Sequence, residues 1–382
     1  MPSNVFSPMT MSIGLRKIPI VAIVAICVGA SGARAAQDPA ANASAAAPQT
    51  LKKSVIGPAV NNGSSMLPVY RDLGVGVWQT ELRWDTIALR RPANPTDPSD
   101  PAYLWPPDLG PAVDEAAAQG IQVSLILYGT PRWANGGLSP RWVPTDPADY
   151  ANFAVAASKK YPHIRFWMIW GEPNRSANLA PFTGAKATGP LTAAQQVAPH
   201  NYARILDAAY GALKSVNPAN TVIGGNTYLS GGTNVIHPYQ WIQYMTLPDG
   251  SRPRFDMYGH NPYGYRKPRL KGPPSKGGQV DFVDLPRFIK AIDRVFPNSP
   301  PMFLSEWGVQ GAKKPAASEV GFALSFKQQA KWIRAAFRIA RRSDRIFTMG
   351  WPHVLANEIS PNGGLLDING NPTPTYYAFK DA

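Results

Sequence analysis

Residues 164–174 read Ile-Arg-Phe-Trp-Met-Ile-Trp-Gly-Glu-Pro-Asn, an almost wholly apolar run that ends in Gly171, Glu172 and Pro173. A short apolar run that is closed by glycine and proline is typical of a β-strand. The stretch therefore predicts a strand over residues 164–170. A polar segment that begins with a glutamate follows it directly.

The same pattern recurs on both sides of this stretch. Strand-like runs are predicted at 54–60, 75–82, 121–128, 164–170, 221–225, 255–259, 302–305 and 346–351. Helical stretches follow them near 65–73, 109–119, 147–161, 201–216, 239–245, 283–295, 326–341 and 374–381. Strands that alternate with helices predict an α/β protein with a parallel sheet, and eight such units close into a single (β/α)8 TIM barrel. An open doubly wound sheet is disfavoured, because no glycine-rich phosphate turn follows the first strand.

The N-terminus has the pattern of an export signal. Arg16 and Lys17 precede an apolar run at 18–28, and small residues continue through Ala33 to Ala35. This order predicts a secretory signal peptide over 1–36, with an uncleaved anchor as the alternative. The run is short for a membrane span, so we expect a secreted or periplasmic protein without a stable span after processing. Residues 37–53, rich in alanine and proline, are expected to form a disordered linker before the barrel at 54–382.

Composition excludes several classes of protein. Hydrophobic residues make up 44% of the chain and charged residues 16%, which argues against a disordered chain. The only cysteine, Cys27, lies in the predicted signal, so the mature chain has no disulfide or cysteine ligand. The histidines lack metal-ligand spacing and no phosphate-binding glycine motif is present, so we expect neither a metal nor a cofactor. The net charge of +14 suits an anionic polymer, but no nucleic-acid-binding motif accompanies it.

Two of the predicted strands end in a glutamate. Glu172 follows the run at 164–170, and Glu306 follows the run at 302–305. In a parallel barrel these strand ends meet at one rim, where active sites lie. A pair of carboxyl groups there suits retaining glycoside hydrolysis, in which one protonates the leaving oxygen and the other attacks the anomeric carbon. The alternative is that each glutamate is an ordinary salt-bridge or capping residue.

Both strand ends resemble known motifs. Residues 169–174, Ile-Trp-Gly-Glu-Pro-Asn, resemble the Trp-Asn-Glu-Pro-Asn acid/base motif of clan A glycoside hydrolases, and 304–308, Leu-Ser-Glu-Trp-Gly, resemble the clan's nucleophile motif. Within the clan the chain looks most like family 39 and related bacterial exopolysaccharide hydrolases and cellulase-like proteins, with support from 129–134 and 363–366. The resemblance implies Glu172 as acid/base and Glu306 as nucleophile, with carboxyl groups about 5–5.5 Å apart.

Other residues at the strand ends are candidates for substrate binding: Trp351, His260, Tyr263, Trp133, Arg83, Asn174 and Trp307. The resemblance implies an indole platform under the sugar at Trp351, and contact of His260 or Tyr263 with the nucleophile or the sugar. Arg83 is a candidate donor to the nucleophile carboxylate, with a surface ion pair as its alternative. Trp133 is a second stacking candidate, with a core role as its alternative. A structural role is the alternative for His260.

One position departs from the clan. Gly171 stands where the clan usually has an asparagine whose amide hydrogen-bonds the sugar 2-hydroxyl. Either another group makes this contact, or the substrate differs around C2. Two alternatives to a hydrolase stay open: a transglycosylase that uses the same site, and a non-catalytic glycan-binding barrel, for which Gly171 is the best argument.

A poly- or oligosaccharide is the expected substrate, and an acidic glycan is one candidate. The loop after the sixth predicted strand carries Arg266, Lys267, Arg269, Lys271 and Lys276, which could attract a uronate. The alternative is a solvated surface loop. The arginines near the end of the seventh predicted helix complement the helix dipole and need no functional explanation.

Overall fold

The computed structural model describes residues 50–185, 189–230, 233–275, 278–312, 323–356 and 363–382. The predicted signal peptide and all but the end of the predicted linker lie outside these ranges. Among the described residues, no helix is both long and apolar enough to cross a membrane.

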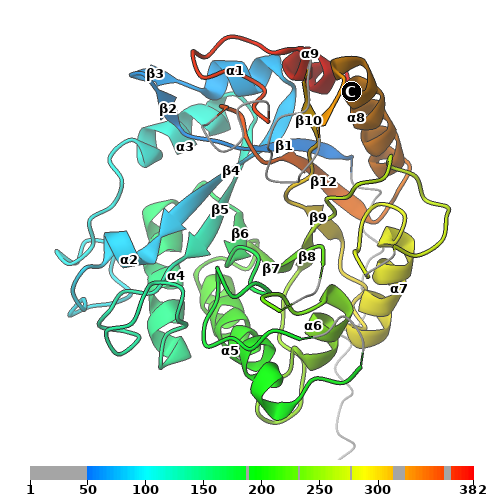
Figure 1. The fold of residues 1–382 in the computed structure, drawn as a ribbon. Helices are drawn as coiled ribbons and strands as arrows, with labels where there is room; N and C mark the ends of the chain where they lie inside the picture. The colour runs from blue at the N-terminus through cyan, green and yellow to red at the C-terminus, as the bar shows by residue number, and fades with distance from the viewer. Residues whose placement is uncertain (1–49, 186–188, 231–232, 276–277, 313–322, 357–362) are drawn as a thin grey trace, which may run out of the picture. The chain divides into compact units, whose positions relative to one another are not determined.

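Eight parallel strands of the described chain close into a barrel in the order β1-β12-β9-β8-β7-β6-β5-β4 (Figure 1). Their bounds are β1 Lys52–Ile56, β4 Val75–Arg83, β5 Gln122–Tyr128, β6 Phe166–Ile169, β7 Thr221–Tyr228, β8 Met257–Asn261, β9 Met302–Leu304 and β12 Ile346–Trp351. Consecutive barrel strands are neighbours and the last pairs with the first, so the predicted TIM barrel is confirmed. Two small sheets, β2 Val60–Asn61 with β3 Ser64–Ser65 and β10 Gln310–Gly311 with β11 Ala323–Leu324, lie in the loops.

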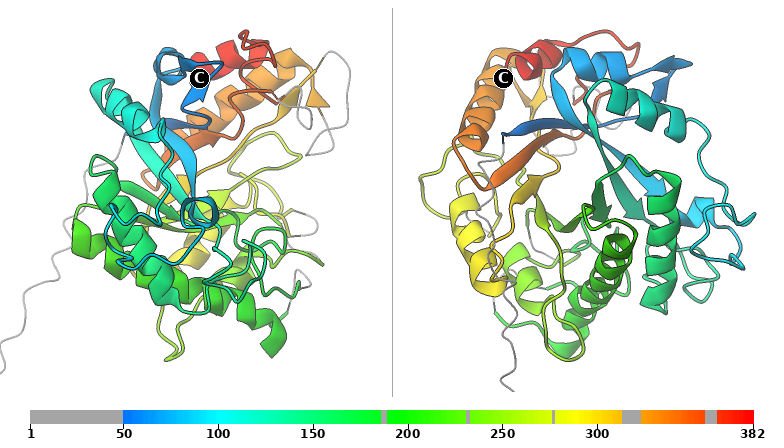
Figure 2. Two further views of the ribbon diagram at one scale, coloured as in Figure 1. Left: turned by 90° about the vertical axis from the view of Figure 1, so that its left-hand side faces the viewer. Right: turned by 180° about the vertical axis from the view of Figure 1, so that it is seen from behind.

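Helices surround this ring of strands (Figure 2). Their bounds are α1 Leu67–Asp72, α2 Trp84–Ile87, α3 Leu109–Ala118, α4 Pro147–Lys160, α5 Ala193–Val216, α6 Pro238–Tyr244, α7 Leu285–Val295, α8 Phe326–Arg341 and α9 Pro374–Lys380. Local signals explain several starts: Asp146 caps α4 before Pro147, and Ser325 and Gln328 form a capping box on α8.

Some predicted boundaries were wrong. Strand β1 begins at Lys52 and ends before Gly57-Pro58, whereas 54–60 was predicted; Lys53 belongs to the barrel and donates to the carbonyls of Phe379 and Lys380. Helix α5 begins at Ala193 rather than 201, because a capping box of Thr192 and Gln195 starts it upstream of an internal proline.

Alternation along the strands divides the core into two parts. Phe166 and Met168 of β6 point into the barrel, where they form a cluster with side chains from the other strands: Val77, Ile126, Ile223, Met257, Phe303 and Phe347. Trp167 and Ile169 belong to the other cluster, which includes residues of the helices. The barrel is therefore packed with side chains, and chemistry is confined to its rim.

Candidate active site

Glu172 is held at the carboxyl end of β6 by an unusual turn. Trp170 and Glu172 both have positive φ values, 67° and 42°, on either side of Gly171. Non-glycine residues rarely adopt this conformation, and such strain is found most often at functional sites. The side chain of Asn178 supports the turn by donating to the carbonyl of Gly171 at 3.1 Å. The turn places Glu172, which is 7% exposed, at the rim of the barrel.

Glu306 follows β9, and a buried polar network fixes the residue before it. Ser305 donates through its hydroxyl to Gln79 of β4 at 2.9 Å, and Gln79 donates back to the carbonyl of Ser305 at 3.0 Å. Gln79 also donates to Ser54 of β1. On the other side of Glu306, the amide of Trp307 donates to the carbonyl of Gly350. The backbone on both sides of Glu306 is therefore anchored to the barrel.

The two carboxyl groups meet around residues of β8 and the loop after it. Asn261 donates through Nδ2 to Oε1 of Glu172 at 3.0 Å, and its side chain also hydrogen-bonds Glu306. Tyr263 donates through its hydroxyl to Oε2 of Glu306 at 2.8 Å. The structure thus brings together Glu172, Glu306 and Tyr263 as the sequence predicts. The expected separation of the two carboxyl groups stays a prediction.

Asn261 was missed by the sequence analysis, although a signal for it existed. It follows Met257 and Gly259 at alternate positions of β8, and Met257 faces the barrel interior. Its Oδ1 is buried without a hydrogen-bond partner among the described residues. A Cβ at Gly171 would meet nothing within 4 Å, so the turn leaves open space there. The amide next to Glu172 comes from Asn261 on β8.

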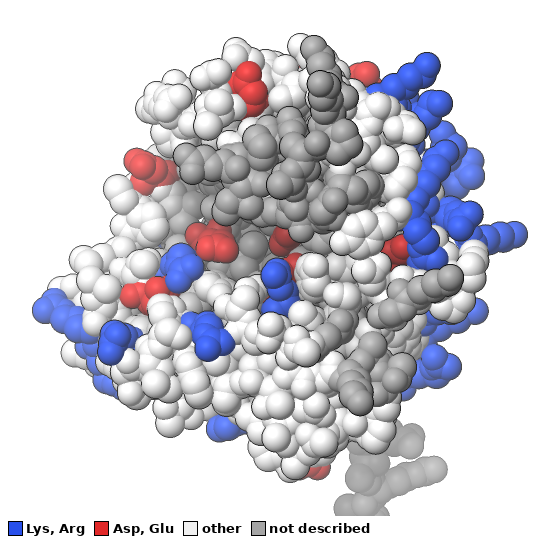
Figure 3. Space-filling model, viewed as in Figure 1, with Lys and Arg blue, Asp and Glu red and all other residues white. Residues whose placement is uncertain are grey.

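Arg175 is the second residue that was missed. Its Nη1 lies 2.5 Å from Oε2 of Glu172, and its guanidinium lies 4.6 Å from the centre of the Tyr228 ring. Acidic and basic side chains lie close together around a hollow near the middle of the face shown in Figure 3. The guanidinium therefore lies between the carboxyl group of Glu172 and the ring of Tyr228 as its two side-chain contacts.

Burial disfavours the charged form of Glu306. Burial and then the charge of Glu172 raise the pKa of Glu306 to about 8, whereas the hydrogen bond from Tyr263 and the charge of Arg175 act to lower it.

Three other candidates are engaged in structural contacts. His260 is fully buried, with Nδ1 against Thr227 Oγ1 and Nε2 against the carbonyl of Val280, both at 2.9 Å. Asn174 uses its amide to tie the β6 turn to Tyr228 and Ile236. Trp307, 3% exposed, packs edge to face against Trp351. For His260 the structural alternative holds, and a substrate contact for Asn174 and Trp307 stays a prediction.

Trp351 lies at the end of β12 but is 1% exposed. Its indole Nε1 donates to the carbonyl of Gly363, and its ring contacts Trp307 and Phe379. These contacts bury the indole in the core of the described structure. Its role as a sugar platform stays a prediction.

Arg83 and Trp133 each make local contacts and do not reach Glu172 or Glu306. Arg83 forms a two-point ion pair with Asp85 and stacks on Tyr128, so the expected bond to the nucleophile is replaced by its alternative, a local ion pair. Trp133 donates to the carbonyl of Ala88, and the guanidinium of Arg91 lies 4.4 Å from its ring centre. Arg91 covers one face of the ring, and a sugar contact for Trp133 stays a prediction.

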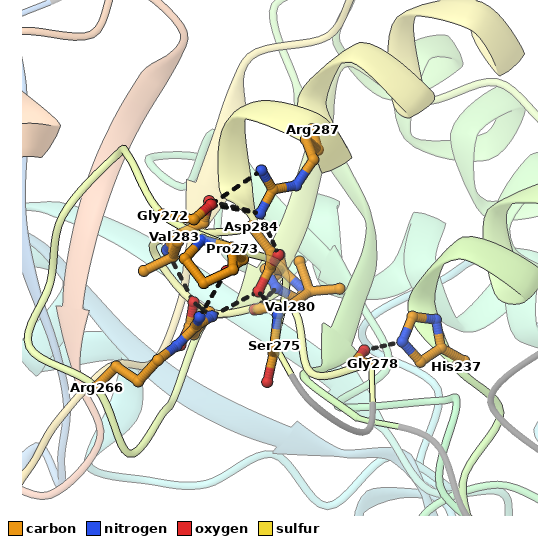
Figure 4. A network of polar contacts seen from close by, with 12 residues as sticks. His237, Arg266, Gly272, Pro273, Ser275, Gly278, Val280, Val283, Asp284 and Arg287 are labelled. Atoms are coloured by element: carbon orange, nitrogen blue, oxygen red, sulfur yellow. Dashed lines mark hydrogen bonds and ion pairs between the residues drawn. The ribbon is translucent and has the colours of Figure 1, made fainter.

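Ion pairs between its own residues hold the basic loop after β8 in place (Figure 4). Arg266 binds Asp281 through two contacts and Asp284 through a third, each 2.7 Å long. Arg266 is therefore a structural residue of this loop. Lys267, Arg269 and Lys271 remain exposed, and Lys276 lies outside the described residues.

Replacing Tyr263 with phenylalanine should lower kcat/KM of the reaction that we propose below by about 10- to 100-fold, the value of a hydrogen bond to a charged group. The loss should fall mainly on kcat. Because this bond lowers the pKa of Glu306, its removal should also shift the acidic limb of the pH–rate profile upward. Tyr377→Phe, an exposed position on α9, is the matched control. An unchanged profile would contradict a role for Tyr263 at Glu306.

His260 should make the fold sensitive to acid. Burial lowers the pKa of His260 from 6.5 to about 4, so between these values the unfolded chain binds more protons than the folded one. Stability is therefore expected to fall by about 3 kcal/mol as the pH drops from 6.5 to 4. Urea unfolding across this range should show a shallower pH dependence for His260→Gln than for the wild type. His163→Gln, at an exposed site, should keep the full pH dependence of stability. If His260→Gln shows the same pH dependence as the wild type, the acid sensitivity comes from other residues.

Among the described residues, no group of three or more His, Cys, Asp or Glu side chains could hold a metal ion. The chemistry available at the rim is that of two carboxyl groups, an amide, a phenol and a guanidinium.

Comparison with known proteins supports the fold. No protein-family model and no curated protein sequence matches the chain. Solved structures do match: a family 39 glycoside hydrolase from Bacteroides cellulosilyticus WH2 (TM-score 0.59, 17% identity), a glucosidase from Croceicoccus marinus (0.62, 17%) and a β-xylosidase from Caulobacter crescentus CB15 (0.57, 15%). Each match covers 87% of this chain, which spans 63%, 67% and 67% of those chains respectively. The chain thus has the barrel fold of glycoside hydrolases, including members of family 39.

Proposed function

We propose that the protein is a retaining glycoside hydrolase that cleaves O-glycosidic bonds in a poly- or oligosaccharide. Glu172 acts as the acid/base, and Glu306 acts as the nucleophile. The observation that carries the proposal is the pair of carboxyl groups from β6 and β9, joined by the amide of Asn261 at the rim of the barrel. The fold shared with a glucosidase, a xylosidase and a family 39 hydrolase supports the same chemistry.

The reaction follows from the two positions. Glu306 attacks the anomeric carbon while Glu172 gives a proton to the leaving oxygen, and a covalent glycosyl–enzyme intermediate forms. Glu172 then takes a proton from water, which displaces Glu306 and restores the original anomeric configuration. Tyr263 orients the nucleophile, and the unpartnered Oδ1 of Asn261 is an acceptor suited to a sugar hydroxyl. The exposed basic residues of the loop after β8 support an acidic glycan as one candidate substrate. The signal-like N-terminus supports export of the protein.

The test is reducing-end release from a panel of neutral and uronate-containing glycans, with the anomer of the first product followed by NMR. We expect activity on one class of glycan and retention of configuration. An inverted product would exclude Glu306 as the nucleophile, and longer glycans in the product mixture would indicate transglycosylation. Glycan binding without turnover across the panel would favour a binding barrel.

A further inference from the structure

The backbone of Arg175 is held in place, whereas its side chain is partly exposed. Its amide donates to the carbonyl of Glu172 at 3.1 Å, and its backbone forms an antiparallel bridge with Val235. The guanidinium stacks over Tyr228, yet the side chain is 38% exposed. Stacking and backbone contacts thus hold an accessible cation beside the proposed acid/base.

The hydrogen-bonding capacity of Arg175 is mostly unused. A guanidinium has five N–H donors in a planar fork that matches a carboxylate at two points. Arginines elsewhere in the described chain use this match, as Arg91 does with Asp149, and Arg345 with Asp293. Arg175 makes one contact, from Nη1 to Glu172, and no second acceptor for it occurs within the described residues. The remainder of the fork is available to a ligand.

We propose that Arg175 binds the carboxylate of a sugar next to the scissile bond, and that the substrate is therefore a uronate-containing glycan. This inference rests on the proposed function. Arg175 thus acts as a substrate-binding residue beside the proposed acid/base.

The experiment compares matched polymers. Polygalacturonate, alginate and a glucuronan are each offered beside the same polymer after chemical reduction of its carboxyl groups to alcohols. We expect the wild type to cleave one acidic polymer with a kcat/KM about 10- to 100-fold above that of its reduced form, the range for charge-assisted hydrogen bonds. Arg175→Gln should bring this ratio close to one, and Arg175→Lys, which keeps the charge but loses the fork, should give an intermediate ratio.

Arg254 offers a matched control. It forms a two-point ion pair with Asp207 and lies 5.2 Å from the ring centre of Tyr210, so it repeats the arginine–acid–tyrosine arrangement. It precedes β8, at the opposite end of the barrel from Asn261. Arg254→Gln should therefore keep the wild-type ratio. A similar fall in both variants would attribute the effect to lost stability and overturn the proposal.

Binding to the Glu306→Gln variant separates this inference from the proposed function. Affinities for oligosaccharides of each polymer and its reduced form are measured with and without Arg175→Gln in that background. Preference for the acidic form that disappears with Arg175 supports the proposal, whether or not turnover is seen. Equal binding of acidic and reduced forms, or an unchanged preference in the Arg175 variant, overturns it. Full turnover by Glu306→Gln would instead refute the proposed function.

Discussion

Glu306→Gln should lower kcat by roughly 10⁴- to 10⁶-fold, as expected when a covalent nucleophile is removed. The amide cannot form a glycosyl ester, and it keeps nearly the size of the carboxyl group. The Ser305–Gln79 network should therefore hold the strand end in place, and the melting temperature should change little. Steady-state kinetics on the active glycan, with thermal unfolding beside it, measures both quantities.

The role of Glu306 can be separated from a general electrostatic effect with a smaller substitution. Glu306→Ala leaves room for azide, which would attack the anomeric carbon from the side of the missing carboxylate. An activated aryl glycoside should then yield a glycosyl azide of inverted configuration. Glu115→Gln, on α3, is the matched glutamate control and should retain wild-type kinetics. A Glu306→Gln variant with activity near that of the wild type would refute the nucleophile assignment.

Glu172→Ala should show a loss that depends on the leaving group. A positioned acid contributes about 10²- to 10⁴-fold, and we expect this loss of kcat/KM on a natural glycan, whose leaving oxygen needs a proton. A dinitrophenyl glycoside leaves without protonation, so formation of the intermediate should be nearly unaffected. Its breakdown should become slow, because no base activates water.

Azide distinguishes this variant from the first one. With Glu172→Ala, azide attacks the glycosyl–enzyme intermediate in place of water, so the glycosyl azide should keep the substrate's configuration. Rates of aryl glycosides with leaving groups of increasing acidity measure the dependence directly. An equal loss for all leaving groups would contradict proton donation by Glu172.

Most of the fold could be predicted from the sequence because its signals are local. Apolar runs alternate with amphipathic stretches, and a parallel strand followed by a helix has one common way to continue. The boundaries that were wrong depend on particular caps. Thr192 and Gln195 start α5 ahead of an internal proline. Strand β1 includes Lys53, whose backbone pairs with β4 and β12 and whose ammonium group reaches two carbonyl groups of α9.

The site divides in the same way. Glu172 and Glu306 could be predicted because each lies a few residues after an apolar strand, and all such strand ends meet at one rim. The side-chain contacts of the other candidate residues could not be predicted with the same success. Arg83 was expected at the nucleophile, but Asp85, two residues away, provides a carboxylate that it reaches with both arms of its guanidinium. His260 was left open between two roles, and its outward direction on β8 gives it Thr227 and Val280 as partners.

The sequence by itself determined the barrel and the two carboxyl groups on its rim, since periodicity and strand ends are properties of neighbouring residues. Only the tertiary structure decided how these carboxyl groups are surrounded. Asn261 reaches them because β8 adjoins β9 and turns its alternate side chains inward. Arg175 stacks on Tyr228 because the β6 and β7 ends are tied together by Asn174. Protonation depends on burial and on charges from distant parts of the chain, and these exist only once the barrel has closed.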